Sequence, residues 1–230
     1  MSIAEKLTTI AENEPRVFEA GKKSQYDLFW DGLQVNGTRN LYPNTFCHWT
    51  DEMFYPKYDI IYGSQSSGLF WYSKIKNIKK RLEECGVTIH WNHTSLQSCF
   101  NECTTEEIPI LDFSGLSSNS SVSMQYTFYH ATNLKKVHIK NAKLAYFQYP
   151  FYSCKALEEI VLENVVFMAI SVNGLSLSAS TKLTKDSLLA VLNALEQTTS
   201  SPKITLGATN LAKLTDAEKA IATDKGWTLA

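Results

Sequence analysis

Two histidines and two cysteines are the residues whose types and spacing could do chemistry. They form an H-x2-H-x5-C-x3-C series: His90, His93, Cys99 and Cys103. Imidazole nitrogen and thiolate sulfur are ligands that zinc prefers, but the spacing matches no recognised zinc motif. His90 also alternates with the apolar Ile89 and Trp91, so a strand here would point His90 away from the core. We predict no metal ligand and no cofactor.

The cysteines and the common catalytic motifs give no further chemistry. The five cysteines are an odd number without the spacing of a disulfide framework, which predicts reduced thiols: Cys47, Cys85, Cys99, Cys103 and Cys154. Cys103 and Cys154 share a position of the repeat described below, where Ala131 stands in another copy, so packing explains them. No G-x-S-x-G, H-E-x-x-H, P-loop or G-x-G-x-x-G motif is present. We predict no catalytic residue and a protein that is not an enzyme; a zinc-dependent or other enzyme is the third hypothesis.

Aromatic residues are dense between Tyr42 and Tyr72. Some of these rings must fill the core, because aromatic side chains bury large areas. Rings that stay exposed would form a platform for a protein or glycan partner, since a ring offers a broad apolar face with little entropy to lose. Our candidate ligand-binding residues are Trp49, Trp71 and Tyr72, with burial in the core as the alternative.

Charge and hydropathy argue against two classes of partner. The net charge of the 230-residue chain is −1, which gives no electrostatic reason to expect binding to nucleic acid. A basic run from Lys74 to Arg81 is followed at once by Glu83 and Glu84, as expected for a solvated helix face. No apolar stretch approaches the ~18 residues of a membrane span. We therefore predict no nucleic-acid partner and no membrane insertion.

The elements that must position these residues are organised by a repeat. The segment FYSCKALEEIVLEN, from Phe151 to Asn164, is a near copy of FYHATNLKKVHIKN, from Phe128 to Asn141. The period is 23 residues (151 minus 128). The apolar strand positions continue upstream, at steps of 22, 26 and 23, through Ile89, Leu111, Val137 and Ile160. A single copy cannot bury its own apolar face, so the copies must stack into one core, and the fold class is an α/β solenoid of short stacked strands.

The pattern F-x-x-C-x-x-L-x-x-I-x-L-x-N resembles the BspA-like class of bacterial leucine-rich repeats over residues 86–180. The last fifty residues, which include LTKDSLLAVLNALEQTT, and the opening KLTTIAENEPRVFEAGKKSQYDLFWDGLQ are similar to the ends of leucine-rich repeat proteins encoded in prophage tail regions of gut Firmicutes. The resemblance implies a structural or receptor-binding protein of a prophage tail assembly. A bacterial cell-surface adhesin with BspA-like repeats is the alternative. The resemblance brings no catalytic residues.

Periodicity and capping residues divide the chain into four parts. Residues 1–33 should form a helical segment, which is either a weak homo-oligomerisation seam or an amphipathic cap. Residues 34–85 should hold aromatic-rich turns, with strands at 59–62 and 69–72 and a helix that ends before Gly86. Residues 86–180 are the repeats. Residues 181–230 should cap the solenoid with a helix begun by Thr184, a capping box at Thr215 and Glu218, and two short strands.

The N-terminal sequence MSIAEKLTTIAENEP is acidic and amphipathic, and it lacks the basic start and unbroken apolar stretch of a secretory signal. We therefore expect synthesis in the cytoplasm without a signal peptide, followed by association with a virion. The cell surface is the alternative location.

Overall fold

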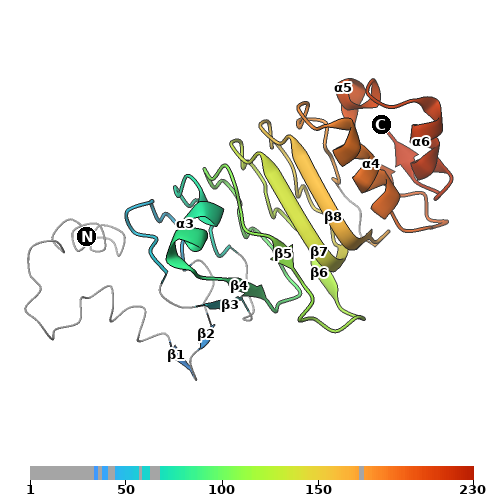
Figure 1. The fold of residues 1–230 in the computed structure, drawn as a ribbon. Helices are drawn as coiled ribbons and strands as arrows, with labels where there is room; N and C mark the ends of the chain where they lie inside the picture. The colour runs from blue at the N-terminus through green and yellow to red at the C-terminus, as the bar shows by residue number, and fades with distance from the viewer. Residues whose placement is uncertain (1–33, 36–37, 41–44, 57–58, 63–67, 171–173) are drawn as a thin grey trace, which may run out of the picture.

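The computed structural model describes residues 34–35, 38–40, 45–56, 59–62, 68–170 and 174–230. The predicted helical segment 1–33 lies outside the described residues. In the described part, successive turns of the chain lie side by side in one elongated row, and the helices of the C-terminal segment gather at one end (Figure 1). The turns are joined to one another by parallel strand pairs and by main-chain hydrogen bonds between turns.

A column of stacked phenylalanine rings runs through the core. Neighbouring rings have centroid distances of 5.1, 5.4, 5.7 and 5.3 Å, and all five are buried: Phe46, Phe70, Phe100, Phe128 and Phe151. The main-chain N–H of each of the first four donates to a carbonyl of the next turn, for example Phe128 to Pro150 at 2.9 Å. The aromatic position that opens the repeat in the sequence is therefore the same position in five successive turns, and it begins upstream of residue 86.

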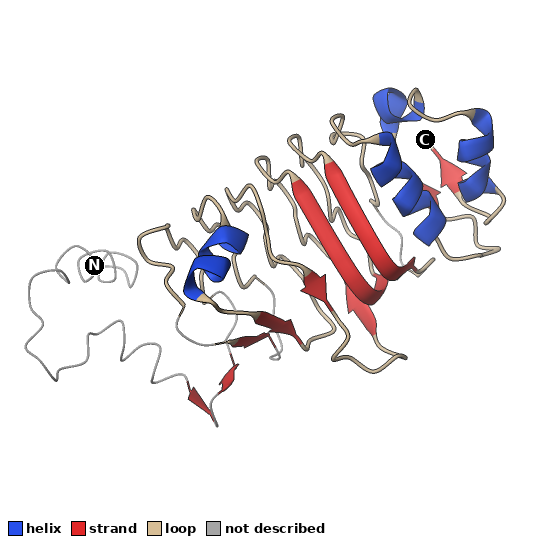
Figure 2. Cartoon of the chain, in the orientation of Figure 1, coloured by secondary structure: helices blue, strands red, loops and turns tan. Residues whose placement is uncertain are grey.

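The strands lie in two main groups. The first has the order β1-β2-β3-β4, with β1 and β2 antiparallel and the others parallel: Gln34–Val35, Thr38–Asn40, Ile60–Tyr62 and Ile89–Trp91. In the second, β5 and β6 pair with different halves of β7, and β8 pairs along β7, all in parallel: Leu111–Asp112, Ser121–Ser123, Lys136–Ala145 and Glu159–Phe167. Figure 2 shows β7 and β8 as two long neighbouring strands. Their inward residues build the core, including Val137, Ile139 and Ile160, together with Leu157 just before β8, while Leu162 is half-buried.

An asparagine forms a corner in the middle of each long strand. Asn141 and Asn164 have φ values of 55° and 53°, in the left-handed region that asparagine tolerates better than most residues. The corner lets a single strand contribute to two sides of the turn. The left-handed backbone conformation at this position therefore explains the asparagine that closes the repeat pattern in the sequence.

Local capping signals position the helices as predicted. The helix α3 (Ile78–Cys85) begins at Asn77, whose side chain accepts a hydrogen bond from Lys80 N, and ends at Gly86 in the left-handed conformation. The helix α4 (Lys185–Ala194) is capped by Thr184. The helix α6 (Asp216–Thr223) has the predicted capping box of Thr215 and Glu218.

The C-terminal segment also contains two strands and one unpredicted helix. The strands β9 (Lys203–Ile204) and β10 (Thr228–Leu229) pair in parallel, and α5 (Gly207–Leu211) follows β9. One expectation upstream is wrong. Residues 69–72 form a turn and not a strand, because Trp71 N bonds to Gly68 O and Ser73 N bonds to Phe70 O, both at 3.0 Å.

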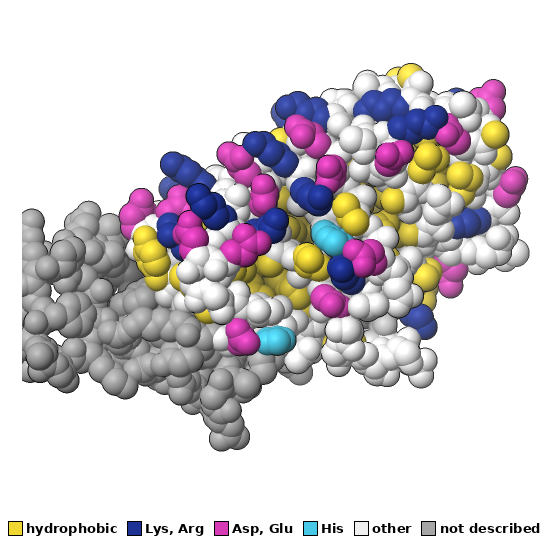
Figure 3. Space-filling view, in the orientation of Figure 1, with side chains coloured by type: hydrophobic (Ala, Val, Ile, Leu, Met, Phe, Trp, Pro, Cys, Tyr) yellow, Lys and Arg dark blue, Asp and Glu magenta, His cyan; other side chains and the backbone are white. Residues whose placement is uncertain are grey.

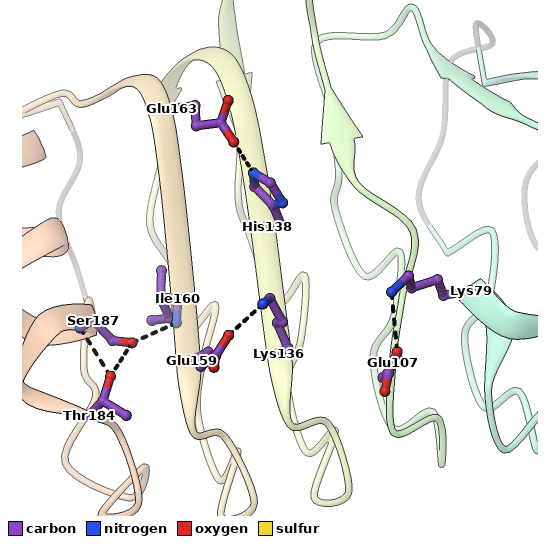
Figure 4. Close-up of polar contacts among 9 residues, drawn as sticks. All are labelled: Lys79, Glu107, Lys136, His138, Glu159, Ile160, Glu163, Thr184 and Ser187. Carbon is purple, nitrogen blue, oxygen red and sulfur yellow. Dashed lines mark hydrogen bonds and ion pairs between the residues drawn. The ribbon is translucent and has the colours of Figure 1, made fainter.

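Positively charged and negatively charged side chains are mixed over the sheet face (Figure 3). The pairs link neighbouring turns: Lys136 with Glu159 at 2.5 Å, and His138 with Glu163 at 2.6 Å (Figure 4). Lysines in these pairs meet carboxylates on the next turn, so this row presents no uniform charge. Because the pairs are exposed, each adds little to stability.

Candidate functional site: an aromatic edge

The turn around each core phenylalanine carries outward-facing residues that line up from one turn to the next. Tyr72 N donates to Asn101 O at 2.9 Å, Glu102 N to Tyr129 O at 2.7 Å, and His130 N to Tyr152 O at 2.8 Å. These bonds place the residues after Phe70, Phe100, Phe128 and Phe151 in one row. We call the following side chains along this row the aromatic edge: Trp71, Tyr72, Tyr126, Tyr129, His130, Tyr149 and Tyr152.

Four tyrosines form a continuous cluster on this edge. The rings of Tyr129 and Tyr152 stack with centroids 5.2 Å apart and planes within 14°. Tyr126 and Tyr149 stand nearly perpendicular to them, at 79° and 78°, with 6.1 Å between their own centroids. Tyr149 and Tyr152 are 44% and 47% exposed. The four rings therefore do not close into a single stack, and the cluster presents both ring edges and ring faces.

The backbone conformation at two positions of this cluster does not favour tyrosine. Tyr126 and Tyr149 have φ values of 52° and 50°, where a bulky side chain costs roughly 1–2 kcal/mol per residue. The corresponding position two residues before Phe70 is Gly68, with a φ of 88°, and glycine adopts such angles freely. One turn therefore has a glycine at this position and avoids the cost. The turns of Tyr126 and Tyr149 have a tyrosine there in spite of the cost.

Gly174 supports the edge from the following turn. It has a φ of 85°, and a Cβ added there would lie 2.8 Å from Cδ1 of Tyr149. One side of the Tyr149 ring therefore lies directly against the Gly174 backbone. The ring is held in place from that side and keeps its exposed area on the other.

Two of the three residues predicted to bind a ligand lie on the aromatic edge. Trp71 and Tyr72 are half-buried, and their rings stack at 5.0 Å; Tyr72 also stacks on His48 at 5.3 Å. A hydrogen bond from the Tyr72 hydroxyl to the Glu102 carboxylate, together with the negative charge of Glu102, raises the pKa of Tyr72. Tyr72 therefore stays a hydrogen-bond donor to Glu102.

The third predicted ligand-binding residue, Trp49, is buried. It is 5% exposed and packs edge-on against Phe46 at 4.9 Å and 71°. Trp49 stands three residues after the core phenylalanine, and the same position is filled by an inward residue in the other turns, such as Cys103 and Ala131. The expectation of an exposed ring at Trp49 is therefore corrected.

A row of glutamines runs beside the tyrosines. Gly68 N bonds to Gln97 O, Ser98 N to Gln125 O, and Tyr126 N to Gln148 O, all at 2.8 to 2.9 Å, so the glutamines lie on successive turns. Gln97 and Gln148 are exposed and Gln125 is half-buried. Within the described part of the chain, the side-chain amides of these glutamines make no hydrogen bond.

The histidine and cysteine series does not come together as a ligand set. His90 is exposed on β4, as predicted, and faces Asp59 at 3.3 Å. Cys99 and Cys103 are buried, and burial raises the pKa of the Cys103 thiol to about 12. His93 Nδ1 accepts from Ser95 N at 3.1 Å. In the described ranges, no three His, Cys, Asp or Glu side chains are arranged to hold a metal ion.

An open hollow of about 490 Å³ lies near the C-terminal segment, lined by Ala169, Ile170 and residues 196–200. Its polar groups already serve the fold. Glu196 Oε2 accepts from Ala169 N at 2.8 Å, and Gln197 Nε2 donates to Asp224 O at 3.1 Å. We therefore place the candidate site on the aromatic edge and not in this hollow.

The tyrosines of the edge were missed because candidate exposed rings were predicted only in the dense stretch from Tyr42 to Tyr72. The signal that could have found them is a dipeptide. Phe-Trp at 70–71 and Phe-Tyr at 128–129 and 151–152 each place two aromatics in succession. At such a turn the first ring points inward and the second points outward.

Comparisons of the chain with protein-family models, with curated proteins and with solved structures find no match. Among the described residues, no helix combines the length and the apolar character needed to cross a lipid bilayer.

Proposed function

We propose that the chain is a non-enzymatic repeat protein of the BspA-like leucine-rich class, whose aromatic edge binds a protein or glycan receptor. The observation that supports this function is the exposed tyrosine cluster, two members of which occupy backbone positions where glycine would cost less. Strained residues that a chain retains are a reason to infer a role for their side chains. Tyrosine suits that role because it offers a large contact area and a hydroxyl at little cost in entropy.

The parallel turns make the edge a linear array. Outward side chains recur on each turn in the same orientation, so one partner can contact several turns at once. Several weak contacts along one surface, or several copies on one particle, add up to tight attachment. A tail appendage of a prophage particle would use the edge in this way, and we propose that assembly as the context. A cell-surface adhesin of the same repeat class would use the same edge.

Binding to bacterial cells tests the proposal. Fluorescently labelled full-length protein is incubated with a panel of gut Firmicutes, and bound protein is measured by flow cytometry. We expect wild-type protein to bind at least one strain and the double variant Tyr129→Ala/Tyr152→Ala to lose binding. The matched control is Tyr55→Ala, because Tyr55 is 45% exposed and its ring packs against Arg81 at 4.4 Å, not against the edge. Equal loss in all variants, or no binding by wild type, would contradict the proposal.

The two contexts are separated by where the protein is found. An antibody against the chain should label purified particles from a prophage-induced lysate if the protein belongs to a tail. It should label intact, uninduced cells if the protein is a surface adhesin. Weak self-association through residues 1–33 is part of the tail proposal, and light scattering of the full chain at rising concentration measures it.

A further inference from the structure

We infer that the ligand of the aromatic edge is a neutral, linear glycan that lies along the row of turns. This inference rests on the proposed binding function and names the chemical class of its ligand. Three features of the edge support it: the repeat distance of its rings, the polar groups beside them, and its low charge.

The repeat distance of the edge fits a chain of sugar rings better than an extended peptide. Turns paired like parallel strands lie about 4.8 Å apart, and the rings of Tyr129 and Tyr152 are 5.2 Å apart. A pyranose unit in an extended glycan advances by a similar distance, so successive units meet successive turns. Side chains on one face of an extended peptide recur only every ~6.8 Å, and they would fall out of step with the turns.

The rings offer the surface that a sugar needs. The face of an aromatic ring carries partial negative charge, and the axial C–H groups of a pyranose carry partial positive charge. Tyr126 and Tyr149 are turned by nearly 80° from their neighbours, so the cluster is not limited to ring edges. Tyr149 has one side against Gly174 and is 44% exposed elsewhere.

The polar groups beside the rings match hydroxyl groups. An amide both donates and accepts hydrogen bonds, and so does a sugar hydroxyl. The side chains of Gln97, Gln125 and Gln148 repeat once per turn and make no hydrogen bond within the described residues. Further along the edge, Trp71 Nε1 and Asn101 Oδ1 are a donor and an acceptor without partners in the described structure. Both atoms are closed to solvent, so they do not add to the polar surface that the glutamines offer.

The charge of the edge favours a neutral ligand. The turn positions that form it carry one carboxylate, Glu102, which is already bonded to Tyr72, and the imidazoles of His48 and His130. Lys136 and Lys140 of β7 lie on the sheet face, where they are paired with Glu159 and Glu163. A phosphorylated or uronic-acid polymer would therefore find no row of cations on the edge.

Titration with defined glycans tests the inference. The probes are β-1,4-linked hexasaccharides of glucose, galactose, mannose and xylose, and binding to the full-length protein is measured by isothermal titration calorimetry. We expect at least one hexasaccharide to bind, the corresponding disaccharide to bind more weakly, and Tyr129→Ala/Tyr152→Ala to weaken binding by about tenfold or more. Tyr55→Ala should bind like wild type. If no hexasaccharide binds, or if the edge variant and the control behave alike, the inference is overturned.

Treated cells separate this inference from the proposed function. Cells that bind the protein are either oxidised with periodate, which cleaves the vicinal diols of sugars, or digested with protease. We expect periodate to abolish binding and protease to leave it. The opposite result would overturn the glycan while leaving a receptor-binding function in place, because a protein receptor would then be the partner. Absence of binding to untreated cells would overturn both.

Discussion

The side-chain amide of Asn164 donates a 3.0 Å hydrogen bond to the side-chain oxygen of Asn141 on the preceding turn. Asn141 in turn donates to Asp112 at 2.9 Å. The side chains of Asn164, Asn141 and Asp112 thus link three successive turns in addition to the main-chain bonds. Because Asn141 and Asn164 are also in the left-handed conformation, each serves the backbone and the neighbouring turn together.

Two substitutions at Asn141 separate these roles. Asn141→Gly removes these side-chain links but keeps the backbone angle available, whereas Asn141→Ala removes the links and adds strain of roughly 1–2 kcal/mol. We expect both variants to unfold at lower urea concentration, with alanine the less stable by about 1 kcal/mol. Equal stability of the two variants would show that the corner stores no backbone strain.

The inward strand positions should dominate stability. Ile160 is 2% exposed in β8, and its N–H donates to Ser187 Oγ at 3.0 Å. We expect Ile160→Ala to lower the free energy of unfolding by about 2–5 kcal/mol, because it leaves a cavity between turns. Glu159→Gln on the outer side should change it by less than about 1 kcal/mol, since an exposed ion pair with Lys136 contributes little. Similar denaturation midpoints for the two variants would show that the strand register is wrong.

Replacement of Tyr149 by glycine should uncouple binding from stability. Tyr149→Gly relieves the strain at a φ of 50° but loses the packing of a ring that is 44% exposed. We expect these effects to offset each other to within about 1 kcal/mol of unfolding free energy, while binding to cells falls. Loss of folding in this variant, measured by circular dichroism, would mean that the tyrosine is structural.

The thiols should fall into two classes of reactivity. Burial raises the pKa of Cys99, Cys103 and Cys154, and it also raises the pKa of the half-buried Cys47 and Cys85. Because the thiolate is the reactive form, all should react slowly at neutral pH. We expect Cys47 and Cys85 to react with Ellman's reagent in the folded protein and the other three only after denaturation. Rapid reaction of all five in the native state would contradict the closed core.

Glu163 should make stability depend on acid pH. Hydrogen bonds from Lys140 and then from His138 lower the pKa of Glu163 below its ordinary value of 4.5. The folded state therefore holds this proton less tightly than the unfolded state, so the contribution is complete above pH 4.5 and is lost as pH falls through the lower, folded pKa. The stability difference between wild type and Glu163→Gln should be constant between pH 5.5 and 7 and shrink toward pH 3. Urea midpoints across this range measure it, and a difference that does not change with pH would refute the pairing.

Much of the local structure could be predicted from sequence because its causes are local. The caps at Thr184, Thr215 and Gly86 depend on neighbouring residues, and each lies where it was expected. The alternation of His90 with the apolar Ile89 and Trp91 also predicted correctly that His90 is exposed. The leucine-rich repeat assignment and the phage context stay predictions.

The candidate site was harder to predict because its members meet only across turns. Tyr129 and Tyr152 are 23 residues apart in the chain and 5.2 Å apart in space. The density of aromatic residues in the sequence pointed to residues 42–72. In that range Trp49 is buried in the core, and only one end of the aromatic edge is found. The missing information was the orientation of each turn, which depends on bulky left-handed residues such as Tyr126 and Tyr149, for which such backbone angles are uncommon.

The direction of the bonds between turns bears on how such a molecule can change in size. Two residues after a core phenylalanine the main-chain N–H points to the following turn, as from Glu102 to Tyr129 and from His130 to Tyr152. Residues 128–150 therefore accept from the preceding turn the same main-chain hydrogen bond that they donate to the following turn. A tandem duplication of that gene segment would insert one whole turn without a new type of junction, and it would lengthen the aromatic edge by one histidine, one glutamine and two tyrosines. The reach of the protein toward its ligand can thus grow or shrink in whole-turn steps, by recombination and without redesign of the core.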